Sequence, residues 1–165
     1  MSALDLRFSL RVIEASRYHG PEPQRYKCPA NCNRQIPYLV IIMSPTTLEH
    51  AFSKDSTSTA VIVPGSPALT VTYKKLATDV KAFQQQLAKV GVSAEAAVSI
   101  ALPNTYEFIV SFIAASWQRA IAAPLNPAYK QSEFEFYIDD LSSAIALVPK
   151  GAFAQDAAAV RAARK

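Results

Sequence analysis

From residue 98 onward the sequence alternates short apolar runs with segments of helical periodicity, and this alternation constrains the fold more than any other feature. Strands are expected over residues 98–102, 120–123 and 144–148. Helices are expected between them, the second one running from a Ser132 cap through Leu141. Connections this short favour parallel strands with helices on the faces of the sheet. The predicted fold class is therefore α/β, with a partial doubly wound parallel sheet.

A β-hairpin is expected ahead of this sheet. Residues 59–63 and 68–72 are rich in β-branched side chains, and the P-G-S-P segment between them supplies turn residues. The Thr72 hydroxyl can cap a helix whose apolar residues recur at steps of four and three and so form a stripe along one face. Gly91 ends that helix. The residues of this stripe are Leu76, Val80, Phe83, Leu87 and Val90.

The helix expected after Pro103 is capped by Asn104 or Thr105, and Glu107 in its first turn suits the helix dipole. Its apolar positions are Phe108, Ile109, Phe112, Ile113 and Trp117. Residues 152–165 are alanine-rich and helical in propensity. They show no Gly or Asn cap and no following strand, as expected of a chain cut within a longer fold.

Charge and hydropathy argue against nucleic-acid binding and against a membrane-spanning helix. The net charge is +4, and the basic excess lies mainly in residues 1–42. The rest lacks a basic stripe interleaved with aromatic residues, so no nucleic-acid partner is expected. The longest wholly apolar run near the front, residues 38–43, is far shorter than the roughly 20 residues of a membrane-spanning helix. No membrane span is expected.

Residues 1–42 lack sustained periodicity, and prolines interrupt them. They are interpreted as an irregular leader. A mitochondrial transit peptide is one interpretation of their arginines, but Asp5 and Glu14 argue against it because such peptides avoid acidic residues. An alternative is that Met43 is the natural start and that residues 1–42 are an upstream extension.

No metal or phosphate site is predicted. Cys28 and Cys32 stand in C-P-A-N-C, which lacks the C-x-x-C spacing of zinc knuckles, and they are interpreted as unpaired thiols in a loop. His19 and His50 are too scattered to complete a site. A phosphate-binding loop needs several glycines close together, whereas this chain has four isolated ones. The four are Gly20, Gly65, Gly91 and Gly151.

The remaining polar residues favour structural roles. Ser111 and Ser116 lack a G-x-S-x-G context and a histidine partner, so a hydrolase triad is not expected. Paired carboxylates occur at Glu133 with Glu135 and at Asp139 with Asp140. Glu133, Asp139 and Asp140 fall on the helix expected through Leu141, whose apolar face is Phe134, Ile138 and Leu141, and this favours solvated surface.

The segment P-L-N-P-A-Y, residues 124–129, follows a strand end, where ligand sites on open α/β sheets lie. It could contact a substrate. A structural role is favoured, because Pro124 and Pro127 restrict the loop, Asn126 can form side-chain-to-backbone turns and Tyr129 can pack.

Four motifs carry a family resemblance that extends over residues 57–150. They are T-V-T-Y-K-K-L at 70–76, L-P-N-x-x-E-F at 102–108, A-A-P-L-N-P-A-Y at 122–129 and E-F-Y-I-D-D at 135–140. Together they resemble the N-terminal part of AMP-binding, adenylate-forming acyl-CoA synthetases. Q-R-A-I-A-A-P at 118–124 is similar to the oxalate:CoA ligase branch, which includes peroxisomal CoA synthetases. Ala96 and Ala97 depart from the Gly-Asp of many relatives.

The resemblance implies an ATP-dependent acid:CoA ligase, which adenylates a carboxylate and passes the acyl group to CoA. The full-length enzyme is expected to use ATP, Mg, CoA and a small carboxylic acid, for which oxalate is the candidate. The family's phosphate loop, magnesium-binding acid and catalytic lysine all match segments beyond Lys165. This chain is therefore predicted to contain no catalytic, no cofactor-binding and no metal-binding residue. Residues 43–165 are interpreted as a truncated first lobe that does not catalyse alone.

Two alternatives stay open, a non-catalytic interaction module and an independent flavodoxin-like ligand-binding domain. The strand over residues 144–148 would be left with an unpaired edge, so self-association or a poorly soluble, molten chain is expected. Reduced thiols and no secretory signal suggest an intracellular location, cytoplasmic or peroxisomal, although the terminal R-A-A-R-K is not a peroxisomal signal.

Overall fold

The computed structural model describes residues 55–165 of the chain. The strands are β1 (Thr59–Val63), β2 (Leu69–Thr72), β3 (Ala97–Ile100), β4 (Ile121–Pro124) and β5 (Ile145–Leu147). The helices are α1 (Tyr73–Lys89), α2 (Tyr106–Trp117), α3 (Gln131–Asp140) and α4 (Ala158–Ala163). The interpretation of residues 1–42 and of Met43, Cys28, Cys32, His19 and His50 lies outside the described residues.

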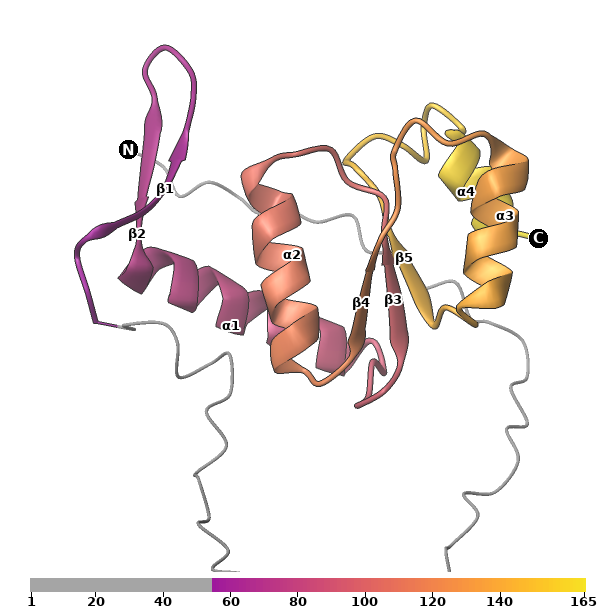
Figure 1. Ribbon diagram of the computed structural model, residues 1–165, viewed down its shortest axis with the longest axis horizontal. Coiled ribbons are helices and arrows are strands. Elements are labelled where there is room, and N and C mark those ends of the chain that lie inside the picture. Colours follow the sequence, from indigo (N-terminus) through magenta and orange to yellow (C-terminus); the bar gives the residue numbers. More distant parts are fainter. Residues whose placement is uncertain (1–54) are drawn as a thin grey trace, which may run out of the picture.

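A three-stranded parallel sheet forms the centre of the fold, in the order β4-β3-β5. Helices α1 and α2 pack together on one side of the sheet, and α3 and α4 pack together on the other (Figure 1). Because helices cover both faces, all four residues of β3 are buried. The predicted α/β fold with a partial doubly wound sheet is confirmed, and each predicted strand lies within two residues of its expected bounds.

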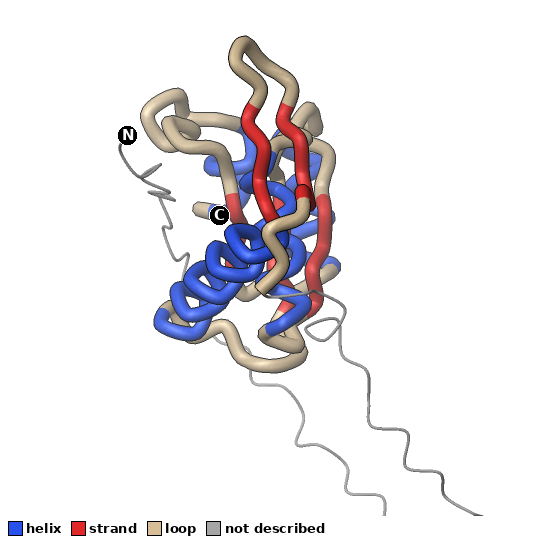
Figure 2. Tube along the Cα trace, turned by 90° about the vertical axis from the view of Figure 1, so that its left-hand side faces the viewer, coloured by secondary structure: helices blue, strands red, loops and turns tan. Residues whose placement is uncertain are grey.

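The predicted hairpin is also confirmed. β1 and β2 pair antiparallel, with Val61 opposite Val71 and Val63 opposite Leu69. Figure 2 shows this pair standing over the N-terminal end of α1. A backbone hydrogen bond from Tyr73 N to Ser58 O, 3.1 Å long, ties the base of the hairpin to the first residue of the helix.

Helix α1 begins and ends where the sequence predicts. Thr72 Oγ1 accepts a 3.2 Å hydrogen bond from Lys75 N, which satisfies one of the free N–H groups of the first turn. Gly91 adopts φ +85°, a left-handed conformation that glycine reaches without a Cβ clash. The predicted stripe lies on the core, with Phe83 and Leu87 among its most buried residues.

The larger core lies between the sheet and the pair α1 and α2. Phe83 and Leu87 of α1 meet Val110 of α2 and Val98 and Ile100 of β3. A smaller cluster on the other side of the sheet centres on Phe134 of α3 and includes Leu125 and alanines of α4. No helix within residues 55–165 combines the length and the apolar character that crossing a membrane requires.

The buried face of α2 differs from the expected one. The fully buried residues are Val110, Ser111, Ala114 and Ala115, whereas Phe112 is exposed. The other predicted apolar positions, Phe108, Ile109, Ile113 and Trp117, are only half-buried. Small side chains let α2 approach the sheet and α1 closely. The side of α2 that carries its small residues therefore faces the core, and the side that carries its larger apolar residues does not.

Two helix boundaries also differ. Ser132 is not the cap of α3, because the helix begins one residue before it and Glu133 Oε2 accepts a 2.7 Å hydrogen bond from Lys130 N. The alanine-rich end is helical only over α4. Before it, residues 151–156 form turns that place Ala152 in the interior, 5% exposed, and burial here overrides helix propensity.

Candidate functional site

The carboxyl ends of β3 and β5 form the place where an open α/β sheet can bind a ligand. The two strands are neighbours, yet the chain leaves β3 toward α2 on one face and leaves β5 toward α4 on the other. Such a switch in direction opens a crevice at the edge of the sheet that the carboxyl ends of the strands form. Backbone bonds define this edge: Ala101 N donates to Leu147 O and Leu125 N donates to Ile100 O, both at 2.9 Å.

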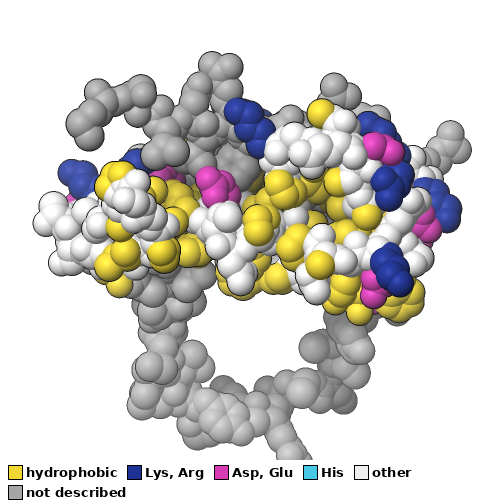
Figure 3. All heavy atoms as spheres, turned by 90° about the horizontal axis from the view of Figure 1, so that it is seen from above, with side chains coloured by type: hydrophobic (Ala, Val, Ile, Leu, Met, Phe, Trp, Pro, Cys, Tyr) yellow, Lys and Arg dark blue, Asp and Glu magenta, His cyan; other side chains and the backbone are white. Residues whose placement is uncertain are grey.

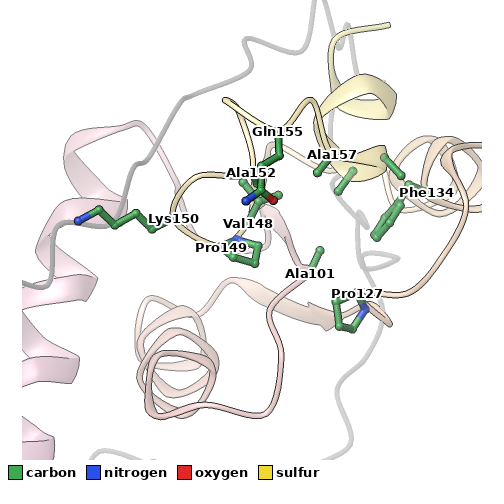
Figure 4. A pocket seen from close by; sticks show the side chains of 11 residues that line it. Ala101, Pro127, Phe134, Val148, Pro149, Lys150, Ala152, Gln155 and Ala157 are labelled. Carbon is green, nitrogen blue, oxygen red and sulfur yellow. The ribbon is translucent and has the colours of Figure 1, made fainter.

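A small cavity lies on the α3–α4 side of this edge (Figure 4), with a volume of about 130 Å³. Ala101, Phe134 and Val148 form much of its wall, and Pro127 comes from the loop after β4. The cavity is smaller than the roughly 300–1,000 Å³ of typical small-molecule sites. Among its lining residues only Lys150 and Gln155 carry polar side chains, and Lys150 extends away from the other lining side chains (Figure 4). No acid–base pair converges there.

The loop after β4 is held by its own side chains. Asn126 Oδ1 accepts a 3.0 Å hydrogen bond from Ala128 N, and Asn126 O accepts one of 3.1 Å from Tyr129 N. Tyr129 stacks on Tyr137, with ring centroids 5.3 Å apart, and meets the edge of Phe134 at 5.8 Å. The predicted turn-forming role of Asn126 and packing role of Tyr129 are confirmed.

Electrostatics couples this loop to α3. The hydrogen bond between the Tyr129 and Tyr137 hydroxyls raises the pKa of the Tyr129 phenol, and the nearby Tyr137 and Glu133 add to the effect. The Tyr129 phenol therefore stays neutral near pH 7, where it acts as a hydrogen-bond donor or acceptor and not as a base.

The other candidate residues are dispersed. Glu133, Asp139 and Asp140 are exposed on α3, as expected of a solvated surface. Glu135 instead pairs with Lys165 at 2.8 Å, and the hydrogen bonds from Lys165 and Gln131 lower the pKa of its carboxyl. Within residues 55–165, no three His, Cys, Asp or Glu side chains gather in a group that could hold a metal ion.

The two serines have separate environments. Ser116 Oγ donates a 2.9 Å hydrogen bond to Phe112 O in its own helix. Ser111 Oγ is buried and has no hydrogen-bond partner among the described residues. The part of the chain that the structure describes contains no histidine, so it holds no serine–histidine pair.

Sequence reasoning missed one polar cluster. Asp79 is 8% exposed on α1, where it accepts hydrogen bonds from Lys75 Nζ and from the hydroxyl of Tyr106 on α2. Its position between Leu76 and Phe83 on the apolar stripe was the available signal, because a carboxylate there must find donors in the core. Burial and the hydrogen bond to Asp79 raise the pKa of the Tyr106 phenol. The cluster joins two helices and lies away from the sheet-edge cavity.

Comparison with known proteins identifies the family. The family model described as AMP-binding enzyme matches residues 48–165. This chain belongs to the AMP-binding enzyme family. The match includes every strand and helix described above and all four sequence motifs. The resemblance to AMP-binding acyl-CoA synthetases is thereby confirmed.

Curated members of the AMP-binding enzyme family resemble the chain over part of their length. The oxalate–CoA ligase of Saccharomyces cerevisiae is 41% identical over 102 residues, which cover 58% of this chain and 19% of the relative. The probable CoA ligase CCL9 of Humulus lupulus is 40% identical over 113 residues, 68% of this chain and 21% of the relative. The chain thus spans about a fifth of the length of these relatives.

A solved structure shows the same fold. The acyl-CoA synthetase of Brucella canis superposes with a TM-score of 0.50 at 23% sequence identity, over 52% of this chain and 16% of that one. At this identity the similarity shows the fold alone. The α/β arrangement is therefore that of an acyl-CoA synthetase segment.

Proposed function

We propose that this chain supplies the first lobe of the large N-terminal domain of an ATP-dependent acid:CoA ligase. The proposed overall reaction is adenylation of a carboxylic acid followed by transfer of the acyl group to CoA, with oxalate as the first acid to test. The observation that carries the proposal is the 41% identity with yeast oxalate–CoA ligase over 102 residues. The Arabidopsis thaliana oxalate–CoA ligase, 41% identical over 80 residues, supports the same substrate.

The proposed role of the lobe is to support a site that other segments complete. The crevice between β3 and β5 has an ordered backbone edge and a small cavity, and the one titratable side chain of its lining, Lys150, extends away from the others. The described residues also lack a set of carboxylates that fits Mg²⁺, so no step is assigned to a metal held by them. ATP, Mg and CoA are proposed as ligands of the complete enzyme.

A chimera tests the lobe assignment. The matching segment of yeast oxalate–CoA ligase is replaced by residues 48–165 of this chain, and formation of oxalyl-CoA is measured with ATP, CoA and oxalate. We expect the chimera to retain activity, because the replaced segment supplies the scaffold and not the reacting groups. A chimera that is folded by circular dichroism but adenylates neither oxalate nor related acids such as malonate and 4-coumarate would contradict the proposal.

The 165-residue chain is tested separately by ATP–pyrophosphate exchange. We expect no exchange with oxalate, since the chain is proposed to act only as part of a larger enzyme. The control is full-length yeast oxalate–CoA ligase at the same concentration. Exchange by the purified chain above the level of a heat-denatured sample would show that it catalyses adenylation alone.

An interaction module is the second candidate function. The specific observation in its favour is the outward side of α2, where Phe112 is exposed and flanked by half-buried apolar residues. If the chimera fails and the isolated chain binds a protein through this side of α2, the module becomes the better description.

A further inference from the structure

We draw no further inference here: the strongest candidate, the apolar groove of about 260 Å³ between the edge of β1 and the start of α2 (Figure 3), carries nothing because nothing in the structure of residues 55–165 shows what covers it.

Discussion

The hydroxyl of Tyr106 donates a 2.8 Å hydrogen bond to Oδ2 of Asp79 and thereby ties the first turn of α2 to α1. Lys75 donates to the same carboxylate from one turn earlier on α1, at 2.5 and 2.7 Å. Lys75 is 56% exposed and Asp79 only 8%, so the lysine brings its charge to the carboxylate from the solvent side. The phenol of Tyr106, a residue that is 9% exposed, completes the set of donors from the core side.

Replacement of Tyr106 by Phe should destabilise the chain by about 1.5–3 kcal/mol, the range for a hydrogen bond to a charged group. The reason is that Asp79 loses its donor on the buried side and keeps only Lys75. Urea unfolding followed by circular dichroism measures the change, with all variants at one protein concentration. Tyr129→Phe, which removes a phenol hydroxyl that is hydrogen-bonded to the neutral Tyr137 and not to a buried carboxylate, serves as the control and should cost no more than about 1 kcal/mol. Equal midpoints for the two variants would contradict the assigned role of Tyr106.

The contact between the hydroxyls of Ser99 and Ser143 predicts that substitutions at these two residues have non-additive effects on stability. They lie 2.6 Å apart in the interior, and Ser99 belongs to the central strand β3. Ser143→Ala alone should cost about 1–3 kcal/mol, because Ser99 Oγ is then buried without a partner. The double variant Ser99→Ala/Ser143→Ala should cost less than the sum of the two single variants, since it leaves neither hydroxyl unpaired. A double-mutant cycle in urea checks this, and strict additivity would show that the two hydroxyls do not interact.

Elements with strong local signals were predictable from the sequence, and α1 shows why. Thr72 caps the helix, Gly91 ends it, and a clear stripe of apolar residues faces the core, so local chemistry and burial agree. The α/β class followed from the order of such elements. The sheet order β4-β3-β5 was not predictable, because it depends on how the crossovers pack on the two faces of the sheet.

Helix α2 shows where sequence reasoning fails. Its apolar residues occupy every side, so periodicity cannot tell which side meets the sheet, and the small residues Ala114 and Ala115 were overlooked. Site residues could be assigned only by resemblance to the family. The expectation that this chain carries no catalytic, cofactor-binding or metal-binding residue stays a prediction. The expectation of a poorly soluble or molten chain also stays a prediction.

Gly91 provides a test of the left-handed helix end. Its φ is +85°, and a Cβ built there meets nothing within 4 Å, so any cost of Gly91→Ala comes from the backbone conformation and not from a clash. We expect a loss of roughly 1–2 kcal/mol, the cost of placing an L-residue in this region. Lys89→Ala, at the last residue of α1, is the control and should change stability by no more than about 0.5 kcal/mol. An unchanged urea midpoint for Gly91→Ala would mean that the helix end rearranges.

The ion pair between Glu135 and Lys165 predicts a pH-dependent stability. Hydrogen bonds from Lys165 and Gln131 lower the pKa of the Glu135 carboxyl, and the bond to Glu135 raises the pKa of the Lys165 ammonium. A lowered carboxyl pKa contributes stability above the unfolded pKa of about 4.3, and this is lost as pH falls through the folded value. A raised ammonium pKa contributes stability below about 10.4, which is lost as pH rises through the folded value.

Glu135→Gln should therefore lower the melting temperature near pH 7 and have a smaller effect near pH 3, where a larger fraction of the Glu135 carboxyl in the unmodified chain is protonated. Salt should reduce the difference at pH 7, because Lys165 is 73% exposed and its charge is screened. Asp140→Asn is the matched control, since Asp140 is exposed on the same helix and makes no ion pair within the described residues. Thermal unfolding of the three proteins at both pH values and at low and high salt provides the comparison. A Glu135→Gln difference that persists unchanged at pH 3 would show that the hydrogen bonds of this side chain, and not its charge, fix the C-terminal residues against α3.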